Sequence, residues 1–258
     1  MLAIEIIMMN IKKHIPNLFT LGNLFCGTLA TIFAVQGQFE MTAIFVVLGI
    51  VFDFFDGFLA RILNVSGELG KQLDSLADMV TSGVAPGLVM FYLLADHSLF
   101  QFSNLEIVNW FGIKLQPIQL IGLLLTLAAC YRLAKFNIDT RQSESFIGLP
   151  TPAMSLFVIS LPLIQMNTEI EFVKEMISNN YFLIAITLLL SYLMNAELPL
   201  FSLKFKNYRI KNNVFKYLLI LLSIILLITV QYLAIPIIIV VYVILSVIDN
   251  INTKKSAV

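Results

Sequence analysis

The sequence predicts an all-α polytopic membrane protein with about eight transmembrane helices, and three observations support this fold class. Hydrophobic residues make up 59% of the 258 residues and charged residues only 12%, whereas a soluble domain carries about 25% charged residues. Long charge-free runs recur along the chain, and a helix needs about 20 apolar residues to cross a bilayer. The basic residues fall almost entirely on one side of the membrane that these runs define. We therefore expect one membrane-embedded domain over residues 1–258.

The helices follow from the charge-free runs in order. These runs are 15–39, 79–95, 115–131, 145–168, 176–196 and 217–248, and a further apolar stretch, 41–60, is interrupted only by two aspartates. We expect the first helix to begin at Pro16, since proline is favoured in the first helical turn. The last run is too long for one span, because a single helix would extend about 48 Å. Gln231 and Pro236 near its midpoint predict a helix pair within 216–249, divided into about 216–232 and 235–249.

The charges predict an orientation and exclude one class of partner. With eight helices, fourteen of the sixteen Lys and Arg residues lie on one side, and only Lys114 and Lys174 lie on the other. Because cytoplasmic loops carry the excess of basic residues, we expect both termini on the cytoplasmic side of the cell membrane. Acidic and basic residues balance to a net charge of zero, which predicts no nucleic-acid partner.

Four aspartates stand out within the apolar segments. Asp53 and Asp56 lie in the second helix, and Asp74 and Asp78 lie near the start of the third. Their spacings of three and four residues project each pair from one face of its helix. A short loop joins the two helices, so the pairs should meet just inside the cytoplasmic boundary. Carboxylates inside a membrane span are costly and therefore indicate a functional site.

This cluster of four carboxylates predicts a metal site. They cannot all be charged in a low-dielectric site without a counter-charge. Arg61 and Lys71 could supply part of it, but oxygen ligands on facing helices suit two divalent cations, Mg²⁺ or Mn²⁺. Two such ions about 4 Å apart would stabilise the attacking and leaving oxygens of a phosphoryl transfer. A salt-bridged helix pair without a metal is the alternative.

Small residues follow the first pair of aspartates. Gly57 and Ala60 lie about one helical turn after Asp53 and Asp56. Small side chains there leave room on the carboxylate face for a bulky polar ligand, and they also permit close helix packing. Both roles are compatible with each other.

The whole motif resembles the signature of the CDP-alcohol phosphatidyltransferase family. Eight fixed positions fall within 26 residues: Asp53-x2-Asp56-Gly57-x2-Ala60-Arg61-x8-Gly70-x3-Asp74-x3-Asp78. The resemblance implies a helical-bundle membrane enzyme that transfers a phosphatidyl group from a CDP-linked lipid to an alcohol and releases CMP. It implies that Asp78 is a metal ligand and the catalytic general base. It also implies a metal-binding role for Asp53, Asp56 and Asp74, and a substrate-binding role for Gly57, Ala60, Arg61 and Gly70.

Other segments of the chain resemble the serine-transferring branch of this family. The family-like core covers residues 10–200 and contains the motif hairpin 41–95. The segments are Pro16-Asn17-Leu-Phe-Thr20-Leu-Gly22-Asn23, Arg132-Leu-Ala-Lys135-Phe-Asn137 and Phe146-Ile-Gly-Leu-Pro150-Thr-Pro152-Ala153. The resemblance implies CDP-diacylglycerol and L-serine as substrates, membrane lipids as partners, a homodimer, and a substrate-binding role for Asn17 and Thr20.

A zwitterionic acceptor such as serine also requires a cation for its carboxylate. Arg132, Lys135 and Arg141 lie on the cytoplasmic face and are the candidates. Ordinary basic decoration of a cytoplasmic loop is the alternative interpretation of these three residues.

Three other functions stay open on the sequence alone. The same chemistry with glycerol 3-phosphate or an inositol phosphate as acceptor would use the same motif. An intramembrane prenyltransferase is also rich in aspartate and dependent on Mg²⁺, although it separates its acidic motifs onto different helix pairs. An ion transporter or channel would use the carboxylates as an ion path, but transporters often contain internal repeats and no second copy of the motif is present.

Overall fold

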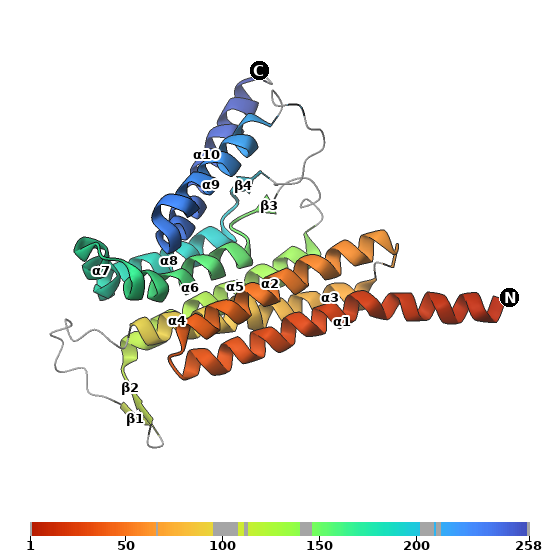
Figure 1. Ribbon diagram of the computed structural model, residues 1–258, viewed down its shortest axis with the longest axis horizontal. Coiled ribbons are helices and arrows are strands. Elements are labelled where there is room, and N and C mark those ends of the chain that lie inside the picture. Colours follow the sequence, from red (N-terminus) through yellow and green to blue (C-terminus); the bar gives the residue numbers. More distant parts are fainter. Residues whose placement is uncertain are drawn as a thin grey trace.

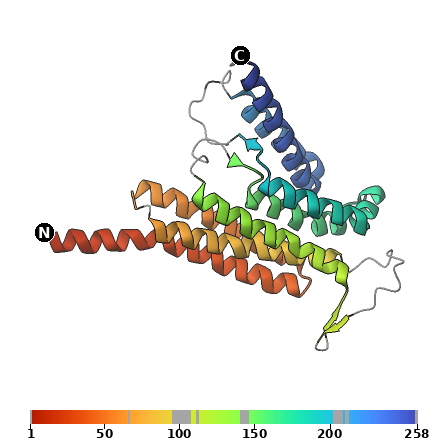
Figure 2. The ribbon, with the colours of Figure 1, turned by 180° about the vertical axis from the view of Figure 1, so that it is seen from behind.

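The computed structural model describes residues 2–65, 67–94, 108–110, 113–139, 146–201, 209 and 213–256. Its helices form an elongated bundle, from which one helical hairpin near the C-terminus leans away (Figure 1). The first half of the chain supplies one side of the bundle, and the helices that follow residue 117 supply the other (Figure 2). Within these described residues, the architecture is all-helical apart from four very short strands.

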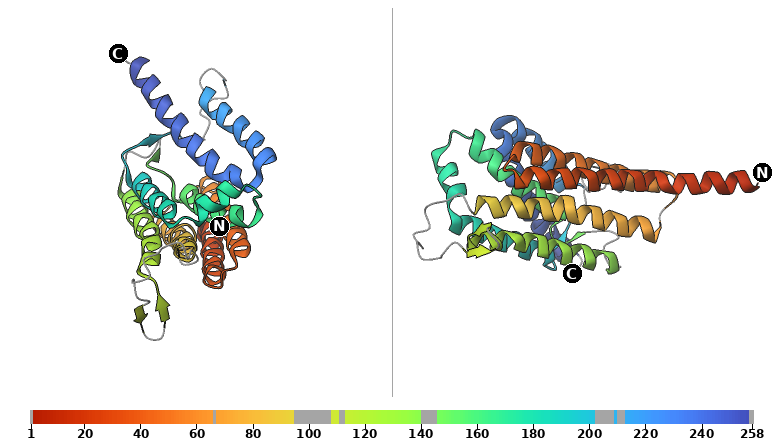
Figure 3. Two further views of the ribbon diagram at one scale, coloured as in Figure 1. Left: turned by 90° about the vertical axis from the view of Figure 1, so that its left-hand side faces the viewer. Right: turned by 90° about the horizontal axis from the view of Figure 1, so that it is seen from below.

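Three long helical stretches build the first half. Helix α1 (Leu2–Val35) pairs with α2 (Phe39–Ile62) through a turn at Gly37, whose φ of 70° suits glycine. Helix α3 (Glu68–Asp78) continues through the π-helical segment η1 (Met79–Val84) into α4 (Ala85–Leu93). Seen from below, α1, the α3–α4 stretch and α5 lie side by side (Figure 3).

The beginning of the first helix differs from the prediction. Helix α1 begins at Leu2, and Pro16 lies inside it, although the segment apolar enough to span a membrane starts at His14. A proline within a helix removes one backbone hydrogen bond. The turns on either side of Pro16 keep their helical geometry, so the helix is not interrupted there.

The second half begins with a β-hairpin and ends with a helical one. Strands β1 (Val108–Trp110) and β2 (Ile113–Leu115) pair antiparallel, as do the two-residue strands β3 (Phe146–Ile147) and β4 (Pro199–Leu200). The remaining helices are η2 (Pro117–Leu123), α5 (Leu124–Ile138), α6 (Thr151–Asn167), α7 (Glu171–Ser178), α8 (Asn180–Asn195), α9 (Val214–Val230), η5 (Gln231–Leu233) and α10 (Ala234–Ser256). The chain reverses at η5, where the sequence predicted a hairpin (Figures 1 and 3).

The predicted eight membrane spans are not confirmed. In the described part of the chain, five helical stretches are long and apolar enough to cross a membrane, or six if α7 and α8, bent by 72°, form one span. Helix α6 has only 17 residues, because it starts after Pro150, and this gives a length of about 26 Å against a hydrocarbon core of about 30 Å. The stretch Val214–Ile251 is one of these candidates, although the chain reverses within it at η5, between α9 and α10.

Small residues bring neighbouring helices of the bundle close together. A Cβ atom added to Gly27 or Gly49 would collide with Thr81 of η1, and one added to Gly122 would lie 2.6 Å from the backbone nitrogen of Phe91. Close backbone approach through glycine is typical of helix packing in membranes. This packing brings η1, which directly follows Asp78, into contact with both α1 and α2.

Candidate active site

Helices α2 and α3 bring three carboxylates to one place. Asp53 and Asp56 of α2 and Asp74 of α3 each offer an oxygen, and these oxygens all lie within 4.8 Å of one another. Asp56 is buried, and the other two are partly buried. The prediction that the two aspartate pairs meet across the hairpin is confirmed for these three residues.

Asp78 is held by a residue of the first helix. The amide nitrogen of Asn23 donates to Asp78 Oδ1 at 3.1 Å, and Thr81 Oγ1 donates to Asn23 Oδ1 at 2.7 Å. Because Asn23 accepts a hydrogen bond from the threonine hydroxyl with its amide oxygen, its NH₂ group points at Asp78. Asn23 and Thr81 are both fully buried. Neither residue was predicted as a site residue, although Asn23 belongs to the segment that resembles the family.

Polar side chains on one side of α1 lie along the aspartate site. Thr20 Oγ1 donates to Asp56 Oδ2 at 2.6 Å, and a Cβ atom on Gly70 would lie 3.4 Å from Asn17 Oδ1. Asn17, Thr20 and Asn23 follow one another at three-residue intervals, so they lie on neighbouring turns of one helix side. This spacing was the sequence signal that could have identified Asn23.

Neither basic residue of the motif hairpin pairs with the aspartates. Arg61 Nε donates to the carbonyl of Gly57 on its own helix at 2.9 Å, and Lys71 Nζ donates to the carbonyl of Asn137. Among the described residues, no ion pair joins either cation to an aspartate. Arg61 and Lys71, which the sequence suggested as counter-charges, therefore do not balance the negative charge of the aspartate cluster.

The donor set fits a divalent cation. One oxygen of Asp74, Oδ1, is buried and has no hydrogen-bond partner, which is unusual for a polar atom in a folded protein. Oxygen ligands from carboxylates are those that Mg²⁺ and Mn²⁺ prefer. Asp53, Asp56 and Asp74 can therefore hold a metal ion, with Asp74 Oδ1 available as a ligand.

A pocket of about 220 Å³ opens beside the aspartates. Its lining comes from α1, α2 and α3 and the loop between the last two: Pro16, Asn17, Thr20, Asp56, Gly57, Ala60, Val65, Gly67, Gly70, Lys71 and Asp74. Five of the predicted substrate-binding residues lie there together. A Cβ atom on Gly57 would meet nothing within 4 Å, so helix packing does not require a glycine at this position.

The remaining predicted substrate-binding residues lie elsewhere. Arg61 is exposed on α2 and does not line the pocket. Arg132 is buried and donates from Nη1 to the carbonyls of Ile147 and Met194 at 2.8 and 2.7 Å. Lys135 forms an ion pair with Glu197 at 2.7 Å. Arg141 lies outside the described residues.

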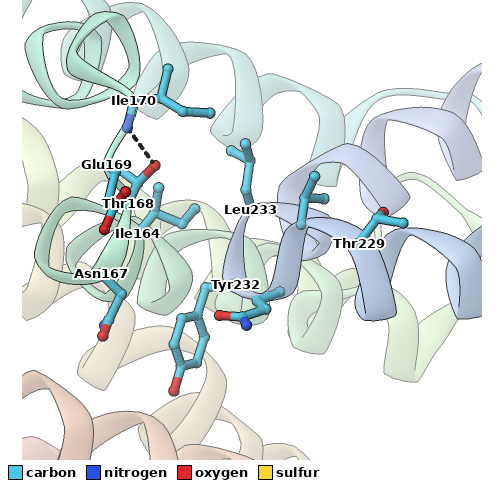
Figure 4. Close-up of a pocket in the computed structure, with 10 residues that line it drawn as sticks. Ile164, Asn167, Thr168, Glu169, Ile170, Thr229, Tyr232 and Leu233 are labelled. Carbon is cyan, nitrogen blue, oxygen red and sulfur yellow. Dashed lines mark hydrogen bonds between the residues drawn. The ribbon is translucent and has the colours of Figure 1, made fainter.

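A second pocket, of about 230 Å³, lies between the end of α6 and the α9–α10 turn (Figure 4). Glu169 is the one carboxylate among the residues that line it, and Thr168 Oγ1 accepts a hydrogen bond from the Ile170 backbone at 3.3 Å. The two pockets share no residue. The residues that line the second pocket include no cluster of metal-binding groups, so this pocket is not suited to metal-dependent phosphoryl transfer.

The family model described as CDP-alcohol phosphatidyltransferase matches residues 13–193, well over half of the chain. The chain belongs to the CDP-alcohol phosphatidyltransferase family. The matched residues run from within α1 to near the end of α8 and include all four aspartates, whereas α9 and α10 lie beyond them. Together with the apolar helices, this membership identifies an integral membrane transferase. It decides against the prenyltransferase and the ion transporter that the sequence left open.

Curated proteins of the same family are similar over half of the chain or more. The CDP-diacylglycerol–serine O-phosphatidyltransferase of Bacillus subtilis (strain 168) is 33% identical over 58% of this chain and 75% of its own length. The protein of that name from Helicobacter pylori (strain J99) is 34% identical over 56% of this chain and 55% of its own length. The archaetidylserine synthase of Methanothermobacter thermautotrophicus is 28% identical over 69% of this chain and 72% of its own length. The matches thus span between about half and three quarters of these relatives.

Proposed function

We propose that this protein transfers a phosphatidyl group from CDP-diacylglycerol to the hydroxyl of L-serine and releases CMP. The observation that carries the proposal is the convergence of carboxylates from α2 and α3 beside an open pocket. The names of the B. subtilis and H. pylori relatives support serine as the acceptor.

The donor site is proposed at the pocket between α1, α2 and α3. Asn17, Thr20, Gly57, Ala60 and Gly70 would line the CDP group, because all of them border the pocket. Arg61, at the end of α2, would contact a phosphate or the membrane interface. The acyl chains stay in the bilayer, and the cytidine lies toward the cytoplasm.

The proposed metal ligands are Asp53, Asp56, Asp74 and Asp78. Two divalent cations, Mg²⁺ or Mn²⁺, would neutralise the diphosphate and stabilise the charge that develops on the leaving CMP. Thr20 would keep the Asp56 carboxylate oriented through its hydrogen bond at 2.6 Å. Asn23 would do the same for Asp78.

The acceptor step needs a base, and we assign this role to Asp78. A carboxylate oxygen of Asp78 takes the proton of the serine hydroxyl, and the serine oxygen attacks the phosphorus that carries diacylglycerol. The bond from that phosphorus to the CMP oxygen breaks, and CMP leaves with the electron pair. Asn23 fixes one Asp78 oxygen at 3.1 Å and leaves the other for the proton.

The arrangement in the membrane is also part of the proposal. Both termini and the aspartate site face the cytoplasm, because the basic residues gather on that side. Residues 1–258 form one catalytic domain, with the α9–α10 hairpin as an addition beyond the matched family region. The family resemblance further suggests a homodimer.

A direct assay tests this function. Purified protein with CDP-diacylglycerol and Mg²⁺ or Mn²⁺ is offered L-serine, glycerol 3-phosphate, an inositol phosphate or water, and CMP and the lipid product are measured. We expect serine to give the fastest CMP release and a chelator to abolish it. If serine is no better than water while another acceptor is, the serine assignment is wrong and the family chemistry stands.

A further inference from the structure

A serine acceptor presents an electrostatic problem at this site. Serine carries a carboxylate at neutral pH, and the pocket it must enter contains Asp56 and Asp74, with two more aspartates beside them. Two divalent cations would offset the four aspartates, but the CDP diphosphate adds further negative charge, and like charges at a few ångströms repel strongly in a partly buried site. A cation within the pocket is therefore needed to bind the acceptor carboxylate and to hold it away from the base.

Lys71 is the one cationic side chain among the described residues that line this pocket. It precedes Asp74 by three residues and Asp78 by seven on the same helix, and these spacings place all three on one face of α3. Lys71 lies one turn closer to the end of the bundle where α3 begins. An acceptor that enters from this end meets Lys71 before it reaches Asp78.

The present partner of Lys71 is a weak one for a cation. Its ammonium donates to the backbone carbonyl of Asn137 in the last turn of α5, and the Asn137 side chain in turn donates to Ser75 Oγ at 2.8 Å. An ammonium has three donors, and no carboxylate in the described part of the chain pairs with Lys71. A substrate carboxylate can be added without breaking an ion pair, and a charge-assisted hydrogen bond is stronger than one to a neutral carbonyl.

The other candidates for this role lie differently. Arg132 is satisfied by two carbonyls and Lys135 by Glu197, and these cations border a space of only about 10 Å³. Asn137 faces α3, whereas Arg132, five residues earlier, points about 140° around the axis of α5. The Arg132 guanidinium is therefore turned away from the aspartates.

We propose that Lys71 binds the carboxylate of the acceptor and so selects an amino-acid alcohol over alcohols without an acidic group. This inference rests on the proposed function, because it names the specificity residue of the same site. The competing interpretation is structural: Lys71 caps the C-terminus of α5 and only joins α3 to α5.

The test compares two acceptors of nearly equal size, L-serine and L-serine amide, in wild type and Lys71→Gln. We expect kcat/KM for serine to fall about 10- to 100-fold, mainly through KM, and that for serine amide to change by less than about threefold. An equal loss with both acceptors, or no loss with serine, overturns the proposal. Wild-type protein that releases no CMP with serine refutes the proposed function instead.

Companion variants separate charge from structure. Ser75→Ala removes the side-chain link to Asn137 but keeps the charge, so the serine-to-amide ratio should stay at the wild-type value; a drop to the Lys71→Gln value assigns Lys71 a structural role and overturns the proposal. Lys174→Gln on the distant helix α7 controls for loss of a positive charge.

If Lys71→Gln does not fold, Lys71→Arg decides: retained preference for serine supports the proposal, and an equal loss with both acceptors overturns it. Selective loss of serine turnover in Lys135→Gln or Arg141→Gln, with Lys71→Gln unaffected, places the carboxylate site elsewhere.

Discussion

The aspartate pocket and the Arg132 cluster are two charged regions of one molecule, each with a buried charged residue, and they differ in whether protein groups satisfy the charges. The Arg132 cluster consists of Arg132, Lys135, Glu197 and the carbonyls of Ile147 and Met194. In this cluster each cation is bonded to protein acceptors, and the adjoining space measures only about 10 Å³. In the aspartate pocket the carboxylates have no cationic partner within the described residues, and about 220 Å³ stays open beside them.

The difference separates structural charges from charges available for chemistry. A buried ion that the fold itself satisfies is costly to remove but binds nothing further. Other carboxylates are oriented by hydroxyl and amide groups but have no counter-charge. Such a carboxylate retains its affinity for a cation. Asp56 with Thr20 and Asp78 with Asn23 are of this second kind.

Replacing Asp78 by Asn would produce the largest effect if this comparison is correct. Asparagine keeps the oxygen that accepts the hydrogen bond from Asn23, so the fold should be preserved, but it cannot take a proton. We expect CMP release to fall about 10²- to 10⁴-fold, measured under saturating serine, with an unchanged melting temperature in detergent. Normal turnover in this variant would rule out Asp78 as the base.

Arg132→Met should act on stability instead of on substrate affinity. Removal of the guanidinium leaves the buried carbonyl of Met194 and the partly buried carbonyl of Ile147 without their donor. Each unsatisfied group costs about 1–3 kcal/mol, so thermal unfolding in detergent should shift clearly downward. A normal melting temperature combined with a raised KM for serine would instead support the role in acceptor binding that the sequence suggested.

Gly57→Ala probes the open side of the aspartate pocket. The new methyl group meets no protein atom within 4 Å, and alanine raises helix stability by up to about 1 kcal/mol over glycine. We expect unchanged or higher stability, together with a loss of activity of at least about tenfold, because the methyl group occupies space needed by the nucleotide.

Gly49→Ala on the same helix is the matched control for Gly57→Ala. Its Cβ atom would lie 2.6 Å from Thr81 Cγ2 and 2.8 Å from Asn23 Oδ1. This variant should lower the melting temperature. Full activity in Gly57→Ala would show that the pocket is not the CDP site.

The smallest effect is expected from breaking the ion pair between Lys135 and Glu197. Both side chains are substantially exposed, with 30% and 58% of their surface accessible, and such pairs contribute less than about 1 kcal/mol. Glu197→Gln should therefore shift the melting temperature by little more than the error of a fluorescence-monitored unfolding curve. A large loss of stability would mean that the Arg132 cluster acts as one cooperative network.

Several features were predictable because they depend on local geometry. The spacing of Asp53 and Asp56, and of Asp74 and Asp78, determines which helix face each pair occupies, whatever the rest of the chain does. The break at Gln231 was visible because one helix of that length exceeds the bilayer. The short α6 was not predicted, since its charge-free run of 24 residues conceals a helix start after Pro150.

By itself, the sequence determined that the chain is a helical membrane protein, that its carboxylates meet in one hairpin, and to which family it belongs. Only the tertiary structure decided that Asn23 and Thr81 orient Asp78, that Arg132 is bound to carbonyls, and that Lys71 borders the pocket. The physical reason is that residue spacing defines a face within one helix, whereas contacts between helices depend on how the helices rotate and pack. Close approach at glycines such as Gly27 and Gly49 sets that packing, and it involves residues far apart in the sequence.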